Sequence, residues 1–179
     1  LVLAQTYPAR AVRVVVPFPP GGSPDILGRI LVQRLSEAWG QQVFIDNRGG
    51  AAGNIGVEAV AKSKPDGYTL IMGNSGTLAV NPSLYAKLPF DPVKDFSPIT
   101  LIAQVPNMLV VHPSLPVKSV KELVTLAKAR PGEVLYGSAG AGSVPYMAVE
   151  YFKMLSGTNI VAVPYKGTGP MMTDLLGGH

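Results

Sequence analysis

The stretch that decides the fold spans residues 13–40 and reads RVVVPFPPGGSPDILGRILVQRLSEAWG. It opens with three consecutive valines, a β-branched run that is typical of a buried strand. Ser23 can serve as a helix N-cap, Pro24 suits the first helical position and Asp25 places an acid in the first turn. The apolar residues that follow recur at spacings of three and four, which predicts an amphipathic helix that ends near Gly40. The stretch is therefore a strand, a glycine-rich loop and a helix.

The same order continues through the first half of the chain. Strands are predicted at residues 42–45 and 68–72, and the helix between them can be capped by Asn54. Strands that alternate with helices over short connections predict a parallel sheet in an α/β fold.

A change in composition marks the end of the first domain. Residues 82–98 contain four prolines and are interpreted as a connector, and the apolar runs at 99–102 and 108–111 are predicted to be strands. We therefore expect residues 1–100 to form the N-terminal part of domain 1 and residues 101–179 to form an incomplete domain 2.

The second half of the chain also has an α/β pattern. Ser119 and Glu122 have the spacing of a capping box, in which the serine accepts from the backbone of the glutamate and the glutamate reaches back. Short apolar runs at 134–136 and 160–163 predict two more strands, and a helix is expected after each of them. Pro170 is placed to open the last helix.

Composition excludes several classes of protein. The chain has 179 residues, of which 47% are hydrophobic and 15% charged, so it can bury a core and is not disordered. It has no cysteine, which excludes disulfides and thiolate chemistry. The formal net charge of +4 is not gathered into a patch with aromatic residues, which argues against nucleic acid and suits a small anionic ligand. No apolar run reaches the roughly 18 residues that a membrane span needs.

The two ends of the sequence suggest a longer parent protein. Residues 1–5 are apolar and end in Ala-Gln, which fits the last residues of an export signal, although an arbitrary boundary would look the same. Gly177 and Gly178 follow the last predicted helix as a stop signal, so a further element is expected after them. We expect the sequence to be truncated at its C-terminal end.

Three loops recur at the point where a buried strand ends and a helix begins. They contain glycine with serine or threonine, at residues 21–23, 137–143 and 167–169. Free backbone amides and the positive end of a helix dipole make such a junction suitable for an anion. In open α/β sheets, ligands bind beyond the carboxyl ends of the strands. The alternative is that these glycines and hydroxyls only serve turns and caps, as they do in any α/β protein.

Motifs for catalysis are weak in this sequence. It has no phosphate-binding loop of the G-x-x-x-x-G-K-[ST] type, no G-x-G-x-x-G after the first strand and no G-x-S-x-G elbow. His112 and His179 are the only histidines, and neither has carboxylates at metal-binding spacing. We expect no catalytic residue, no cofactor and no metal.

Five further segments, taken with the opening stretch, carry a family resemblance. They are Asn47-Arg48-Gly49-Gly50-Ala51-Ala52-Gly53, Pro65-Asp66-Gly67-Tyr68-Thr69-Leu70, Asn81-Pro82-Ser83-Leu84-Tyr85, Asp95-Phe96-Ser97-Pro98 and Tyr165-Lys166-Gly167. Over nearly the whole chain the sequence resembles the Bug-type solute-binding proteins, which are the extracytoplasmic receptors of tripartite tricarboxylate transporters. It is a little more than half as long as a usual member and lacks the segment that finishes domain 2 and returns to domain 1.

The resemblance implies a type II periplasmic-binding-protein fold, with two Rossmann-like lobes and the ligand in the cleft between them. In the family, the loop after the first strand and the later Tyr-Lys-Gly loop hold one carboxylate of the ligand, partly through ordered water. The Gly/Ser loop at 137–143 would add amides and hydroxyls, and Ser75 is a further candidate. The ligand-binding residues expected on this basis are Phe18, Gly21, Gly22, Ser23, Asp25, Ser75, Ser138, Gly140, Ser143, Tyr165, Lys166, Gly167 and Thr168.

The resemblance therefore predicts a periplasmic receptor that captures a small carboxylate and delivers it to the membrane subunits of a transporter, without inserting into the membrane itself. Two alternatives remain open from the residues. One is an α/β enzyme that acts on a carboxylated or phosphorylated metabolite, and the other is an interaction domain without a small ligand.

Overall fold

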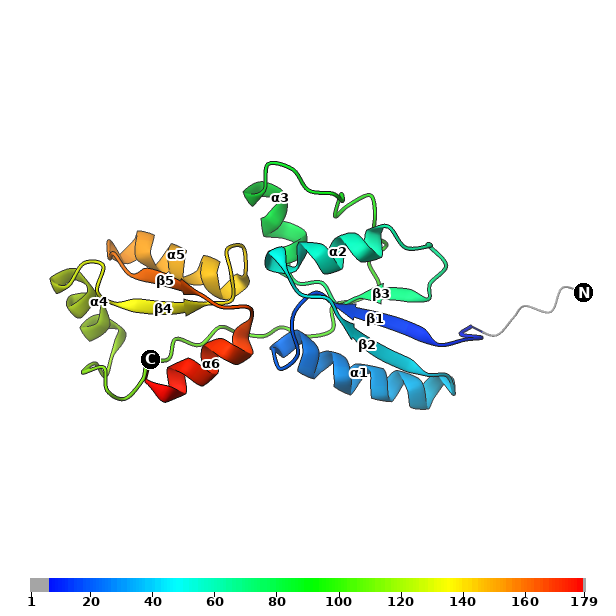
Figure 1. Cartoon of the computed structure of the whole chain (residues 1–179), viewed down its shortest axis with the longest axis horizontal. Helices are drawn as coiled ribbons and strands as arrows, with labels where there is room; N and C mark the ends of the chain where they lie inside the picture. Colours follow the sequence, from blue (N-terminus) through cyan, green and yellow to red (C-terminus); the bar gives the residue numbers. More distant parts are fainter. Residues whose placement is uncertain (1–6, 179) are drawn as a thin grey trace, which may run out of the picture. The chain divides into compact units, whose positions relative to one another are not determined.

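A computed structural model describes residues 7–178 of the chain (Figure 1). The chain divides into two compact units, Leu1–Ile99 and Thr100–His179, which are described here one at a time as unit 1 and unit 2. The predicted export-signal remnant at residues 1–5 and His179 lie outside the described residues. Within the described part, no helix has both the length and the apolar character that a crossing of the bilayer requires.

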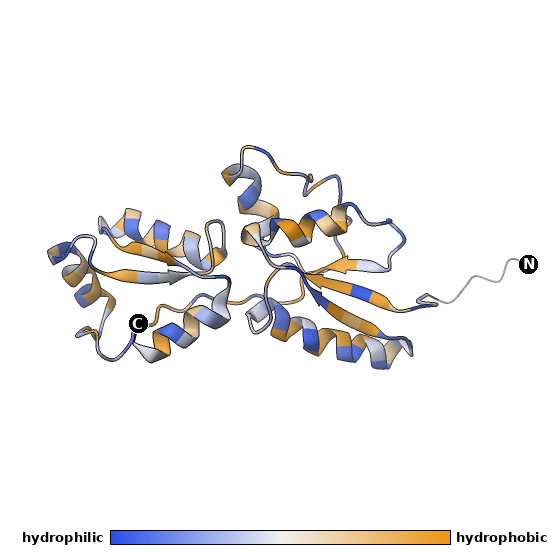
Figure 2. Ribbon diagram, viewed as in Figure 1, coloured by the Kyte–Doolittle hydropathy of each residue, from blue (hydrophilic) through white to orange (hydrophobic). Residues whose placement is uncertain are grey.

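Unit 1 is built on a three-stranded parallel sheet. The central strand is β1 (Val12–Val16), flanked by β2 (Val43–Asn47) on one side and β3 (Thr69–Ile71) on the other. The valines of β1 are buried because the strand has neighbours at both edges and helices on both faces. Figure 2 shows β1 and β2 mostly in the hydrophobic colour.

Two helices cover the sheet of unit 1 on opposite faces, as Figure 1 shows. Helix α1 (Ser23–Trp39) packs Leu27, Leu35 and Trp39 against the buried cluster of β1 and β2. Helix α2 (Asn54–Ala61) lies on the other face and contributes the buried Val57. A turn of 3₁₀ helix, η1 (Ala51–Gly53), precedes α2, and after β3 follow a turn of π-helix, η2 (Gly76–Val80), and α3 (Asn81–Leu84).

The helix ends confirm the predicted stop of α1 and show that two predicted N-caps are wrong. Gly40 ends α1 as predicted, in the left-handed region at φ 63°, with its N–H donating to the Ser36 carbonyl over 3.1 Å. Ser23 is not the N-cap, because Gly22 holds that position and Ser23 is already the first helical residue. Asn54 does not cap α2 either: Gly53 is the N-cap, and the Asn54 side chain accepts a buried hydrogen bond from Asn81 over 2.7 Å.

Unit 2 contains a two-stranded parallel sheet. It is formed by β4 (Leu135–Ser138) and β5 (Val161–Pro164), with Leu135 opposite Val161 and Ser138 opposite Pro164. Three helices accompany it: α4 (Val120–Ala129), α5 (Val144–Ser156) and α6 (Thr168–Gly177). The buried hydrophobic residues of this unit are Leu123, Ala127 and Ile160.

The strands predicted at 99–102 and 108–111 are wrong, because the structure has irregular backbone at both places. Their apolar side chains are largely exposed, for example 73% of Leu101 and 84% of Met108. A β-branched or apolar run becomes a strand only where a neighbouring strand accepts its hydrogen bonds. No strand among the described residues pairs with either run.

The predicted capping box at the start of α4 is confirmed, with one change in detail. The Ser119 hydroxyl accepts from the backbone N–H of Glu122 over 3.2 Å. The Glu122 carboxylate accepts from the N–H of Lys118 over 2.6 Å, one residue before the serine. Both sides of the reciprocal pair are therefore present, and they satisfy two backbone donors that the helix itself cannot satisfy.

The capping box supports a prediction about stability. Replacing Ser119 with alanine should lower the free energy of unfolding of the intact protein by about 1 kcal/mol, because the N–H of Glu122 loses its acceptor. Urea denaturation followed by circular dichroism measures this loss. Ser119→Asp retains an acceptor at the cap and serves as the control. An alanine variant that is as stable as the parent protein would show that the cap contributes nothing here.

Candidate functional site

The predicted site residues of unit 1 lie at the carboxyl ends of two of its three parallel strands. Phe18 and the loop to Ser23 follow β1, and Ser75 follows β3. The connection after β2, at residues 48–53, is rich in glycine and contains no predicted site residue. The three connections meet beside Gly53, where an added Cβ atom would lie 3.3 Å from the Phe18 ring and would overlap the Thr77 side chain. Sheet topology therefore places these loops at one edge, which is the ligand-binding edge of open α/β sheets.

Asp25 lies at the centre of a hydrogen-bond network in the loop after β1. Its side chain is buried, with the residue only 3% exposed. One carboxylate oxygen accepts from the Gly21 N–H over 3.0 Å and from Arg29 Nε over 3.0 Å, and the other accepts from Asn47 Nδ2 over 3.0 Å. Asn47 also donates to the Phe18 carbonyl over 3.1 Å. The Asp25 carboxylate and the Gly21 amide, both predicted to contact a ligand, therefore contact each other.

The charge of Asp25 gives a prediction about pH. The hydrogen bond from Arg29 lowers the pKa of this carboxyl most, and those from Gly21 and Asn47 lower it further, while burial opposes the shift. The folded protein thus binds this proton less readily than the unfolded chain, in which an aspartate has a pKa of about 3.9. The contribution of Asp25 to stability should be complete above that pH and should be lost as the pH falls below it. Urea midpoints measured between pH 6 and pH 3 test this, and midpoints that do not fall would contradict it.

The other predicted residues of unit 1 differ in exposure. Gly22 is buried as the N-cap of α1, whereas Ser23 and Ser75 are exposed and Phe18 is half-buried. The first amides of α1 have no intrahelical partners, as at any helix start. Ser23 therefore offers a hydroxyl beside these amides, although it does not cap the helix.

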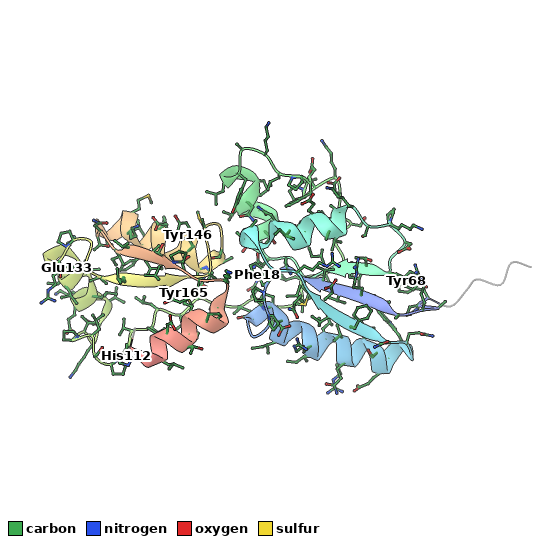
Figure 3. The ribbon with its side chains drawn as sticks, viewed as in Figure 1. Phe18, Tyr68, His112, Glu133, Tyr146 and Tyr165 are labelled. Atoms are coloured by element: carbon green, nitrogen blue, oxygen red, sulfur yellow. The ribbon has the colours of Figure 1, made fainter. Side chains whose placement is uncertain are left out.

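In unit 2, the loops after β4 and β5 lie together. Ser138 ends β4 opposite Pro164 of β5, and the Tyr165 N–H donates to the Ser138 carbonyl over 2.7 Å. The Tyr165 ring also packs near Gly137, where an added Cβ atom would lie 3.6 Å from it. Tyr165 and Tyr146 are labelled in Figure 3. Two of the three predicted loops are thus brought to one edge of the same sheet.

The serine hydroxyls of the loop at 137–143 accept hydrogen bonds from the backbone. Ser138 is 1% exposed, and its Oγ accepts from the Gly140 N–H over 3.2 Å. Ser143 is the N-cap of α5, and its Oγ accepts from the Tyr146 N–H over 3.4 Å. A hydroxyl that accepts from an amide still has its own hydrogen to donate. Each of the two hydroxyls therefore accepts a hydrogen bond from the backbone and still has a hydrogen that it can donate to an anion.

The last predicted loop leads into α6. Gly167 is the N-cap of this helix at φ 120°, a backbone conformation that favours glycine, and Thr168 is the first helical residue. Lys166 is exposed. The Asp174 carboxylate raises the pKa of the Tyr165 phenol.

Sequence reasoning missed the roles of several asparagines. Asn47 joins the carboxyl end of β2 to the loop after β1, and the buried pair Asn54–Asn81 joins α2 to α3. Asn74 and Thr77 bond reciprocally after β3. A signal that could have indicated Asn47 is an asparagine at the carboxyl end of a strand in an α/β fold. Two surface hollows of unit 2 lie along Leu109–Leu123, and no predicted site residue lines them.

Comparison with known proteins identifies the fold and then the family. A solved structure described as the periplasmic binding protein BugD matches with a TM-score of 0.84 at 34% identity, over 96% of this chain and 57% of that one. A solved structure of a Rhodopseudomonas palustris protein with adipate matches with a TM-score of 0.93 at 48% identity, over 96% and 57%. The predicted α/β class with parallel sheets is confirmed, and the fold is that of periplasmic binding proteins.

The family follows from the sequence match. Residues 27–179 match the family described as the tripartite tricarboxylate transporter family receptor. Protein BugT of Bordetella pertussis is 44% identical over 178 residues, which are 99% of this chain and 55% of BugT. The chain belongs to the tripartite tricarboxylate transporter receptor family, as the resemblance predicted. It spans about half the length of the relatives that it matches.

Proposed function

We propose that the chain is part of a periplasmic receptor that binds a small carboxylate and delivers it to the membrane subunits of a tripartite tricarboxylate-type transporter. The observation that carries the proposal is the chemistry of the loops at the carboxyl ends of the strands. They offer hydroxyls, helix-start amides and one lysine, and the carboxylate among them, Asp25, is already paired with Arg29. Donors of this kind bind an anion.

The same chemistry favours binding over catalysis. A general acid or base needs a titratable group within reach of the substrate, with a pKa suited to proton transfer. The Asp25 carboxyl is held ionised and buried by its partners, and Tyr165 has its pKa raised beside Asp174. We therefore propose that the ligand is bound and released unchanged.

Several donors are needed for useful affinity. A charge-assisted hydrogen bond contributes roughly 1.5–3 kcal/mol, and a micromolar Kd requires about 8 kcal/mol after the costs of association. One loop cannot supply this amount, whereas donors from several loops can. The protein solved with adipate is a relative in fold and sequence, which makes dicarboxylates the first ligands to test.

Calorimetry on the intact protein tests the proposal. Adipate, succinate, citrate and glutamate are titrated, with sodium chloride at equal ionic strength as the control. We expect saturable binding of at least one acid and recovery of that acid chemically unchanged. If none of the acids binds, the proposed receptor function is contradicted. Conversion of a bound acid to product supports the enzyme alternative.

A further inference from the structure

Asp25 connects the loop after β1 to neighbouring segments through the hydrogen bonds of its carboxylate. It lies in the first turn of α1, and its carboxylate receives donors from three places: the loop after β1 through Gly21, the second turn of α1 through Arg29, and the end of β2 through Asn47. We propose that Asp25 is a positioning residue which, with Asn47 and Arg29, holds the loop from Phe18 to Ser23 in its ligand-binding shape without touching the ligand. The proposal rests on the proposed function.

The arrangement requires an ionised carboxylate at this position. All three partners of Asp25 are donors, at 3.0 Å each, so the side chain must accept on both oxygens. An ionised carboxylate is an acceptor only and meets this demand, whereas a carboxamide presents an NH₂ group that would face a donor. At 3% exposure the site has little room for water to replace the lost bond.

Asn47 connects Asp25 to Phe18, which lies at the start of the loop. Its Nδ2 donates both to Asp25 Oδ1 and to the Phe18 carbonyl, and its Oδ1 lies 3.5 Å from Arg29 Nη2. The loop is thus tied at Phe18 and at Gly21, on either side of Pro19 and Pro20. A loop that is already ordered loses less conformational entropy when a ligand binds, which improves affinity without a new ligand contact.

The test compares Asp25→Asn with the parent protein in the intact chain. Asp66→Asn is the matched control, because Asp66 also pairs with an arginine, Arg10, and precedes β3 at the opposite edge of the sheet. Calorimetry with adipate, succinate and citrate should give a Kd at least tenfold weaker in Asp25→Asn for every acid that the parent binds. The factor should be similar for each acid, since the loop shape acts on the shared carboxylate group. The stoichiometry should be unchanged, whereas partial unfolding would lower it.

A ligand-independent measurement separates this inference from the proposed function. The Gly21 N–H donates to the Asp25 carboxylate, so its hydrogen exchange should become at least tenfold faster in Asp25→Asn and stay unchanged in Asp66→Asn. Unchanged exchange overturns the inference even if no acid binds, and an absence of binding by the parent protein overturns the proposed function alone. A loss of affinity confined to one acid also overturns the inference, since it indicates direct contact with the ligand. If Asp25→Asn does not fold, Asn47→Ala should show the same pattern with a threefold to tenfold effect.

Discussion

Replacing Gly56 with alanine is expected to lower the free energy of unfolding by about 2 kcal/mol, although alanine is the better helix former. Gly56 lies within α2, where an added Cβ atom would be 2.7 Å from the Arg48 carbonyl oxygen and 2.8 Å from Pro17 Cα. Both are backbone atoms at the carboxyl ends of β2 and β1 and cannot rotate away. Overpacking of this kind costs about 1–3 kcal/mol or more, which exceeds the gain in helix propensity of up to about 1 kcal/mol.

Urea denaturation of the intact protein measures the effect, and Gly40→Ala is the matched control. Gly40 has open space where a Cβ atom would lie, but its φ is 63°, so alanine there meets strain without a clash. We expect a cost of about 1–2 kcal/mol at Gly40 from the left-handed conformation. A stabilising effect of Gly56→Ala would show that α2 can move away from the sheet at no cost.

Ser138→Ala is expected to weaken the binding of a carboxylate by about 1–3 kcal/mol, or about 5- to 150-fold in Kd. The substitution removes a hydroxyl that has one hydrogen left to donate, and it leaves the Gly140 amide without its acceptor. Both losses occur at a buried position, where water replaces a hydrogen bond poorly.

Calorimetry measures the change, with Ser156→Ala as the control. Ser156 is half-buried at the end of α5, and its hydroxyl donates to the Phe152 carbonyl, away from the loop at 137–143. The control should leave the Kd unchanged. An unchanged Kd in Ser138→Ala, with full stoichiometry, would remove this hydroxyl from the proposed site.

The elements that could be predicted are those whose signals are local. The valine run of β1, the spacing of apolar residues in α1, the left-handed stop at Gly40 and the capping box at Ser119 all act over a few residues. None of these signals depends on contacts with residues that are distant in the sequence. The order of strands and helices follows from these signals, and the parallel sheets follow from that order.

The wrong predictions come from local sequence patterns that are compatible with more than one structure. Ser23 and Asn54 are good N-cap residues, yet a glycine immediately before each takes the position and moves both into the first helical turn. The runs at 99–102 and 108–111 have the composition of strands, but a strand also requires a partner.

The amino-acid sequence alone determined the α/β class, the parallel order and the three loops rich in glycine and hydroxyls, because periodicity, caps and turns are read over short distances. Only the tertiary structure decided which groups Asp25 contacts. Its partner Asn47 is 22 residues away along the chain, at the end of β2, and Asn47 Nδ2 comes within 3.0 Å of Asp25 Oδ1 because β2 pairs with β1. Side-chain partners at such separations depend on how strands pair, which no local pattern specifies.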